Sequence, residues 1–142
     1  MDVGLQLILT SGGWDETPSD GQVYAEEVTL GRQAEALGFD AIWPTEHHFF
    51  DYSFCPDNLL LLSYFAACTE TIALGTAAII LPWNDPLRVV EKMLMLDILS
   101  EGRAILVMGR GAARREFRSF GGELADSREM CDEAAVIILE GL

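Results

Sequence analysis

The chain alternates short, continuously apolar segments with amphipathic segments of helical period, and the alternation repeats four times. The apolar segments are rich in β-branched residues and bounded by Gly, Pro or polar residues, which is typical of strands. Strands without polar alternation are covered on both faces, as in parallel sheets with helical crossovers. The expected strands are 3–10, 39–44, 72–81 and 104–108, and the expected helices are 22–37, 59–68, one from 86 to near 100–102, and one that starts near 126.

This order indicates an α/β fold, and two architectures fit it. One is an open, doubly wound sheet, and the other is half of an eight-stranded (β/α)8 barrel. Four units at this spacing project to roughly 280 residues for eight, close to the ~250 residues of a complete barrel. We therefore expect a single domain over 1–142 that corresponds to the N-terminal part of a barrel, with about four β/α units in a half-barrel.

Helix boundaries are marked by capping residues. Gly38 is expected to end the first helix in the left-handed conformation. Asp85 and Pro86 are expected at the N-cap and first position of the third helix. Asp126 with Glu129 three residues later predicts a capping box at the start of the last helix. The third helix is expected to bury Leu87, Val90, Leu94 and Ile98 on one face.

Charge and composition exclude several classes of partner. The formal net charge is -14, which disfavours nucleic acid and anionic membranes because both are bound through Lys and Arg. No apolar stretch approaches the roughly 20 residues that span a bilayer, and no basic n-region of a signal peptide precedes the first strand. Three widely spaced cysteines predict a reduced, cytoplasmic protein. Six of the nine basic residues lie between 103 and 128, where they could hold a small anion or form solvated ion pairs.

Polar residues follow each expected strand, and the C-terminal ends of parallel strands meet at one rim where ligands bind. The loop 11–13 follows the first strand, Glu46-His47-His48 the second, the segment 80–83 the third and Gly109-Arg110-Gly111 the fourth. A histidine, a carboxylate and an arginine therefore converge although they are distant in the sequence. The sequence predicts a site at this rim.

His47 and His48 are the only histidines and admit three interpretations. Together with Glu46 they suggest a metal site, but successive residues of an extended chain point to opposite sides, so a metal is disfavoured. One or both rings could simply pack and form hydrogen bonds at the strand end. The sharper hypothesis is an imidazole that exchanges a proton near neutral pH.

The segment 109–114 begins like a dinucleotide-binding fingerprint, since two glycines flank one residue directly after a strand. It departs from that fingerprint because Arg114 occupies the sixth position and the strand is the fourth rather than the first, so a nicotinamide site is disfavoured. Arg110 between two glycines could instead bind a phosphate bidentately where the backbone approaches closely. The alternative is a structural turn with an exposed arginine.

Several short segments in a fixed order carry a family resemblance. They are Glu46-His47-His48-Phe49, Thr69-Glu70-Thr71, Gly75-Thr76-Ala77-Ala78-Ile79, Leu81-Pro82, Pro86, Arg88, Glu91, Leu96-Asp97, Leu99-Ser100, Gly102-Arg103, Arg110-Gly111, Phe117-Arg118, Phe120-Gly121 and Ser127-Arg128. Each is weak alone, but in this order they resemble the alpha chain of bacterial luciferase and its flavin-dependent monooxygenase relatives. The chain departs from that pattern in two places. Asn84-Asp85-Pro86 stands where many members have a histidine before the proline, and Gly109 stands where luciferase alpha chains have a cysteine.

The resemblance implies a TIM-barrel enzyme that uses reduced flavin mononucleotide (FMN) and molecular oxygen to insert one oxygen atom into an organic substrate, an aldehyde in the luciferases. It implies that His47 is the catalytic histidine beside the flavin ring and handles protons. It places Arg110 at the flavin phosphate and a cis peptide between Ala77 and Ala78 under the flavin ring. No metal is implied.

The resemblance also implies partners and leaves alternatives open. The expected partners are the flavin, a small organic substrate and a separate flavin reductase that supplies reduced flavin. Because a half-barrel leaves sheet edges and apolar side chains uncovered, we expect a homo-oligomer or pairing with another barrel half. One alternative is an oxidoreductase of the same superfamily that uses the deazaflavin F420. Another is a non-catalytic half-barrel that binds flavin or serves assembly.

Overall fold

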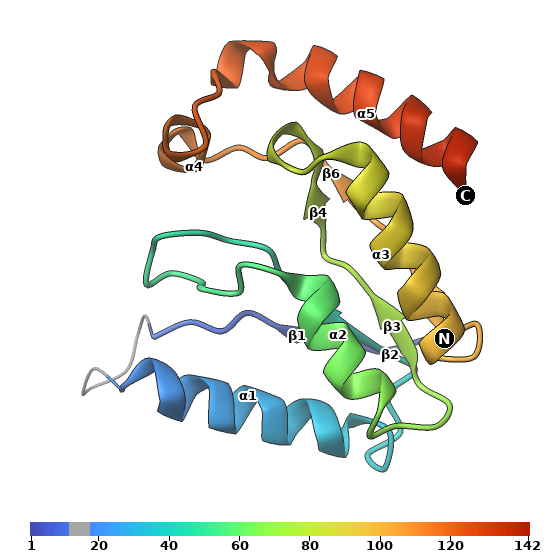
Figure 1. Ribbon diagram of the computed structural model, residues 1–142. Coiled ribbons are helices and arrows are strands. Elements are labelled where there is room, and N and C mark those ends of the chain that lie inside the picture. The colour runs from blue at the N-terminus through green and yellow to red at the C-terminus, as the bar shows by residue number, and fades with distance from the viewer. Residues whose placement is uncertain (12–17) are drawn as a thin grey trace.

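A parallel sheet lies at the centre of the computed structural model, which describes residues 1–11 and 18–142 (Figure 1). Its neighbours all pair in parallel in the order β1-β2-β3-β5, and β4 pairs in parallel with β6 in a second, two-stranded sheet. The expected parallel arrangement in chain order is therefore confirmed, while the expected loop signal at 12 and 13 lies outside the described residues. The strands are β1 (Gly4–Leu7), β2 (Ala41–Pro44), β3 (Ala73–Gly75), β4 (Ile79–Ile80), β5 (Ala104–Ile105) and β6 (Met108–Gly109).

The third expected strand is divided after Gly75, and the buried Thr76 that follows forms hydrogen bonds with the backbone of Val107 through its side chain. Its hydroxyl accepts from Val107 N at 2.8 Å and donates to Val107 O at 2.9 Å. The chain resumes as β4 after the peptide between Ala77 and Ala78, which is cis as the resemblance implied. The fourth expected strand is divided at the same level into β5 and β6.

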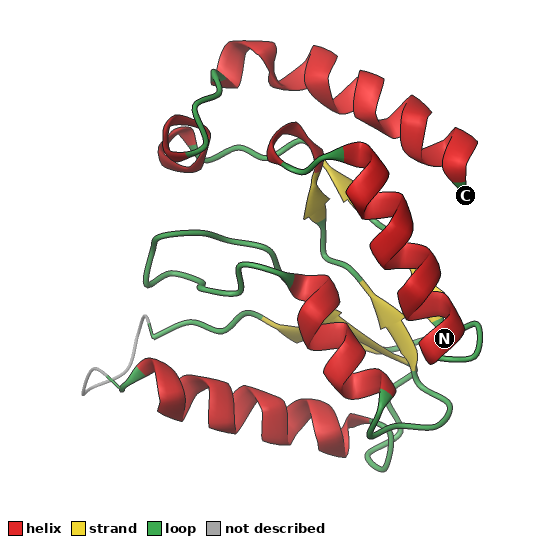
Figure 2. Cartoon of the chain, in the orientation of Figure 1, coloured by secondary structure: helices red, strands yellow, loops and turns green. Residues whose placement is uncertain are grey.

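Helices surround the sheet in chain order (Figures 1 and 2). Helix α2 packs on α3, and α3 packs on α5. Gly38 has a φ of 85° and ends the turn after α1, and the Asp85 side chain caps α3 by accepting from Arg88 N, both as expected. The helices are α1 (Asp20–Ala34), α2 (Asn58–Ala66), α3 (Pro86–Leu99), α4 (Arg114–Ser119) and α5 (Ser127–Gly141), with short 3-10 helices η1 (Leu81–Trp83) and η2 (Leu124–Asp126).

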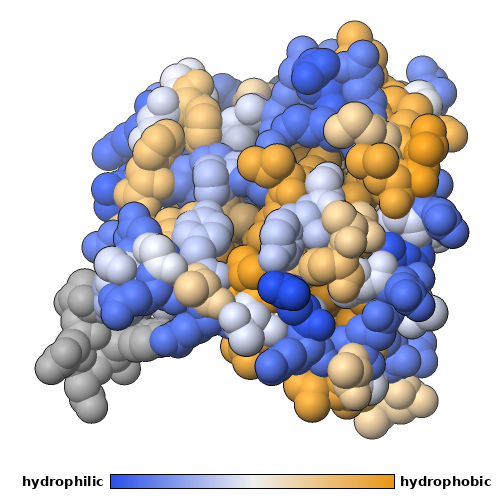
Figure 3. Space-filling model, turned by 60° about the horizontal axis from the view of Figure 1, so that its bottom comes forward, coloured by the Kyte–Doolittle hydropathy of each residue, from blue (hydrophilic) through white to orange (hydrophobic). Residues whose placement is uncertain are grey.

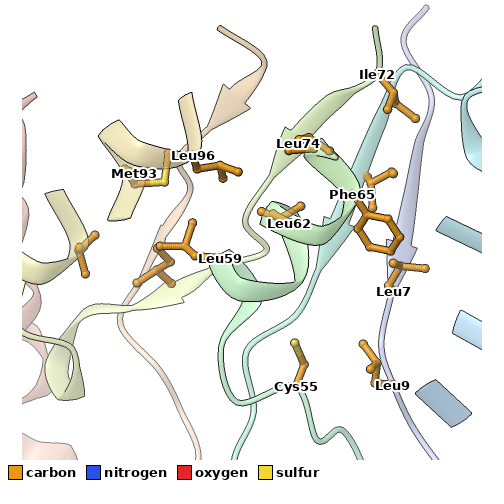
Figure 4. Close-up of a cluster of buried hydrophobic side chains, with 14 of the residues drawn as sticks. Leu7, Leu9, Cys55, Leu59, Leu62, Phe65, Ile72, Leu74, Met93 and Leu96 are labelled. Atoms are coloured by element: carbon orange, nitrogen blue, oxygen red, sulfur yellow. The ribbon is translucent and has the colours of Figure 1, made fainter. Parts of the chain in front are cut away.

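The core lies between the sheet and the first three helices (Figure 4). Phe65 of α2 lies beside Leu7 of β1, and both side chains are fully buried. Gly31 of α1 makes this contact possible, since a Cβ there would overlap the Phe65 ring. The absence of a side chain at Gly31 therefore sets how closely α1 approaches α2.

The buried face of α3 differs from the expected one. Leu87, Leu94 and Ile98 are exposed, Ile98 by 76%, and only Val90 of the expected set is buried. The helix is apolar nearly all round, so more than one face satisfies the helical period and periodicity alone selects the wrong one. The residues that do face the core are Val89, Val90, Met93 and Leu96.

The predicted capping box at α5 is wrong. Asp126 has helical angles (φ -88°, ψ -5°) because η2 runs directly into α5, and its side chain makes no cap hydrogen bond. Instead the Ser127 hydroxyl donates to Leu124 O at 2.7 Å. Helix α4 was not expected at all. Its six residues are rich in arginine and show no apolar residues repeated at helical spacing.

Apolar side chains also reach the surface. Figure 3 shows hydrophobic areas between hydrophilic ones on one face of the molecule. Within 1–11 and 18–142, no helix is long and apolar enough to cross a membrane. Exposed apolar residues on the helices include Leu30, Leu60, Tyr64, Leu87, Leu94, Ile98, Val136 and Leu139.

Candidate functional site

Glu46 lies directly after β2 and ties the rim together. This buried carboxylate accepts from Ile80 N at 3.0 Å and from Trp83 Nε1 at 2.7 Å. It also accepts from Asn84 Nδ2 at 3.0 Å and contacts His48 Nε2 at 3.2 Å. With both oxygens occupied, Glu46 fixes the loop after β2 against β4 and η1. Its role is to hold this part of the rim in place.

His47 turns away from Glu46 and binds a carboxylate from a distant part of the chain. Its Nδ1 lies 3.0 Å from Oε1 of Glu116 on α4, and the same oxygen accepts from His48 N at 2.8 Å. The His47 ring also meets Tyr52 edge-on, with centroids 5.5 Å apart. Its side chain is 34% exposed, whereas Glu116 is buried. His47 is therefore both held in place and open to solvent.

His48 has the opposite character. Its side chain is 10% exposed, and its ring packs edge-on against Phe120 at 4.8 Å and Trp83 at 5.8 Å between centroids. The packed-ring interpretation thus describes His48, while His47 retains an open edge. The two rings bind different carboxylates, and among the described residues no group of three or more His, Cys, Asp or Glu is placed to hold a metal ion.

A cavity of about 300 Å³ opens beside His47. Its walls come from the loop after β2 and from the start of α4, and the exposed Phe50 and Tyr52 supply aromatic surface. Arg115 lies over the Phe50 ring at 5.1 Å, so one wall is closed by a cation–π contact. The lining residues are His47, His48, Phe50, Tyr52, Ala113, Arg114, Arg115 and Glu116.

Ala77 and Ala78 lie between β3 and β4. Ala77 N donates to Pro44 O at 3.0 Å, and Ala78 O accepts from the buried Asn58 side chain at 3.1 Å. Gly109 of β6 approaches Ala78 so closely that a Cβ on Gly109 would lie 3.1 Å from the Ala78 Cβ. The ends of β4 and β6 are thus packed together, next to Arg110.

Arg110 is exposed at the end of β6 and lies near the first turns of α5. Burial raises the pKa of the Cys131 thiol, as does the charge of Asp132, whereas the charges of Arg110 and Arg128 lower it. The charges of both guanidinium groups thus act on this thiol. The exposed Arg110 suits a phosphate, because a guanidinium offers several donors in a planar fork.

The structure brings the predicted site residues together only in part. Ala78 adjoins the strand end that carries Arg110, but the cavity at His47 includes none of Ala77, Ala78 and Arg110. Sequence reasoning missed the role of Glu116, whose partner is 69 positions away. The only available signal was that Glu116 is the sole acidic residue between Arg110 and Arg118.

The whole chain matches the family model described as luciferase-like monooxygenase, over residues 1–142. It is 35% identical over 114 residues to the alkanal monooxygenase alpha chain of Photorhabdus luminescens, covering 80% of this chain and 32% of that protein. The chain thus spans about a third of the length of this relative.

Solved structures agree with the fold. A monooxygenase, RslO1, from Streptomyces bottropensis has a TM-score of 0.89 at 32% identity, covering 97% of this chain and 42% of its own. The oxygenating constituent of 3,6-diketocamphane monooxygenase from Pseudomonas putida, in complex with FMN, has a TM-score of 0.86 at 24% identity over 97% and 38%. An F420-dependent secondary alcohol dehydrogenase has a TM-score of 0.77 at 17% identity over 96% and 40%. The latter two likenesses concern the fold alone.

Proposed function

The chain belongs to the family of luciferase-like monooxygenases, and from this premise we propose that it forms part of a reduced-flavin-dependent monooxygenase. The reaction uses molecular oxygen and inserts one oxygen atom into an organic substrate. The observation that carries the proposal is the position of His47, in the wall of a largely apolar cavity at the C-terminal end of a parallel strand. Ligands bind at these strand ends in parallel α/β folds.

The proposed cofactor is reduced FMN, as the family resemblance implies. Arg110, exposed at the end of β6, offers a guanidinium group that can bind a phosphate bidentately. The proposal assigns the phosphate to Arg110 and the flavin ring to the backbone at Ala77 and Ala78. When bound, the reduced flavin supplies two electrons, with which one oxygen atom leaves as water while the other enters the substrate.

His47 is assigned to proton transfer. Its ring is anchored through Nδ1 and open to the cavity at its other edge, so a reacting group in the cavity can exchange a proton with it. Glu46 is occupied by three donors, from Ile80, Trp83 and Asn84, and has no such freedom. The aromatic side chains of Phe50 and Tyr52 line the cavity beside this ring.

Separate measurements of binding and turnover test these roles. The chain is combined with a complementary half-barrel from a relative, and an aliphatic aldehyde is the first substrate to try. His47→Ala is expected to slow oxygenation by about 10²- to 10⁴-fold with little change in flavin affinity. Arg110→Ala is expected to weaken flavin binding by about 10- to 100-fold, the loss of a charged hydrogen bond. Full activity of His47→Ala, or unchanged flavin affinity of Arg110→Ala, would show that the assigned role is wrong.

One other function shares this fold. The second candidate is hydride transfer to or from a deazaflavin, the alternative that the family resemblance leaves open; an F420-dependent dehydrogenase has this fold. Parallel titrations with FMN and F420, followed by absorbance, distinguish the two cofactors. Saturation by neither would favour a non-catalytic half-barrel.

The proposal includes partners and location. A flavin reductase supplies the reduced cofactor, and a second barrel half or a second copy of the chain covers the open sheet edges. A cytoplasmic setting agrees with three cysteines that are all free thiols: Cys55, Cys68 and Cys131.

A further inference from the structure

We propose that Glu116 is a positioning residue that fixes the ring orientation and tautomer of His47, so that Nε2 faces the cavity as a proton acceptor. The inference deepens the proposed function and rests on it for the reaction that His47 serves. The tautomer itself can be tested without any cofactor.

The contacts of Glu116 define its action. Oε1 lies 3.0 Å from His47 Nδ1 and accepts from His48 N at 2.8 Å. An ionised carboxylate only accepts hydrogen bonds, so the proton of a neutral His47 ring must lie on Nδ1. Nε2 then carries the lone pair, and no described residue forms a hydrogen bond with it.

Aromatic packing holds Glu116 where it can act. Phe117, the next residue on α4, is buried and meets Trp83 edge-on, with centroids 5.1 Å apart. Phe120 at the end of α4 stacks on the same indole at 5.4 Å. The Trp83 Nε1 in turn donates to Glu46. Helix α4 is thus docked on η1, and the carboxylate is presented to the loop after β2 from a fixed direction.

A single oxygen of Glu116, Oε1, contacts both the His47 ring and the His48 backbone. Because His48 N and His47 Nδ1 both donate to Oε1, the backbone and the ring are aligned by one atom. No arginine of α4 forms an ion pair with Glu116, although Arg114 and Arg115 precede it in the described helix. The Glu116 carboxylate therefore interacts with His47 and not with the arginines of its own helix.

The direct test is a long-range proton–nitrogen correlation spectrum of the ¹⁵N-labelled full chain at about pH 8.5, where an ordinary imidazole of pKa about 6.5 is neutral. The spectrum shows which ring nitrogen carries the proton. The parent is expected to show it on Nδ1 of His47. Glu116→Leu is expected to move it to Nε2, the form that free histidine prefers. Glu123→Leu, which removes an exposed glutamate after α4, should leave His47 unchanged.

Glu116→Gln separates geometry from charge. Its amide oxygen can still accept from both donors, and His48 N holds that oxygen toward the ring, so the proton is expected to stay on Nδ1. If Glu116→Leu does not fold, the parent and Glu116→Gln spectra decide the matter. A proton on Nε2 of the parent would overturn the inference, and so would an unchanged tautomer in a folded Glu116→Leu.

Turnover in the complemented enzyme adds a second readout. Glu116→Leu is expected to lower the oxygenation rate about 10²-fold, the lower end of a general-base contribution, while flavin affinity changes less than about twofold. If the parent oxidises no substrate, the proposed function fails while the tautomer result still decides the role of Glu116. A Glu116→Leu enzyme as fast as the parent would remove the catalytic part of the inference.

Discussion

At the scale of single residues, the rim depends on buried carboxylates whose donors come from different segments. Glu46 receives one backbone donor from the end of β4 and two side-chain donors from residues between β4 and α3, and it also contacts His48. A carboxylate accepts at both oxygens, whereas an amide accepts at only one. Replacing Glu46 by its amide should therefore leave one of these donors without an acceptor.

Glu46→Gln is expected to reduce the free energy of unfolding by about 1 to 3 kcal/mol, because one buried donor loses its acceptor and faces an amide N–H instead. The measurement is urea denaturation followed by Trp fluorescence. Glu91→Gln is the matched control, since Glu91 is 65% exposed and pairs only with the exposed Arg88 in the described structure. Equal stability of Glu46→Gln and the parent would contradict the proposed role of Glu46 in holding this part of the rim in place.

The sequence predicted those site residues that strand ends locate. His47 and Arg110 follow apolar runs, so their positions at the rim could be inferred from periodicity and the parallel fold. Glu116 could not, because its contact with His47 joins positions 69 apart and depends on how α4 docks. Spacing along a chain carries local information, and this contact is tertiary.

At the scale of elements, Gly31 sets the packing of α1 on α2. Gly31→Ala is expected to destabilise the protein by about 1 to 3 kcal/mol, since the added methyl would overlap Phe65 in the core. Gly21→Ala on the same helix has only the Ser19 hydroxyl nearby, at 4.0 Å, and is expected to be neutral or to stabilise by up to about 1 kcal/mol through helix propensity. Thermal unfolding of the pair measures the difference, and two equal shifts would refute the packing argument.

Glu35 at the end of α1 braces the turn before β3. Its carboxylate accepts from the backbone N–H groups of Glu70, Thr71 and Ile72 and from the Thr71 hydroxyl. Hydrogen bonds from the Thr71 side chain, then from the Thr71 backbone, lower the pKa of Glu35 to about 2 from its usual 4.5. The folded state thus binds this proton more weakly than the unfolded state does.

The lowered pKa of Glu35 makes the free energy of unfolding depend on pH. The stabilisation from ionised Glu35 is present above about pH 4.5 and is lost as the pH falls towards 2. The unfolding free energy of the parent should exceed that of Glu35→Gln near pH 6, and the gap should close below pH 4.5. Glu26→Gln on the exposed face of the same helix should show no such gap. A gap independent of pH would mean that the charge of Glu35 is not what matters.

Helix existence was easier to predict than helix orientation. The four strand–helix units, the Gly38 stop and the Asp85 cap all rest on local rules and are confirmed. The face of α3 was wrong because its apolar residues surround the axis, and α4 was missed because its arginines give no period. Both depend on which neighbours the helix meets.

At the scale of the whole molecule, the described strands leave β1 and β5 with a partner on one side only. Exposed Leu and Ile side chains on α2, α3 and α5 add apolar surface. Unpaired edges and apolar patches favour association. Light scattering at micromolar concentration is expected to report a mass above that of the monomer, and a stable monomer of 15.6 kDa would contradict this expectation.

The central claim, that this chain carries a flavin site, is tested most directly by titrating FMN with the purified chain and following flavin fluorescence. The account predicts saturable binding that Arg110→Ala weakens by about 10- to 100-fold, as expected for a lost charged hydrogen bond to phosphate. Arg88→Ala, which removes an exposed arginine of α3, should leave the affinity unchanged. No saturable binding, or equal affinity for the parent and Arg110→Ala, would contradict the account.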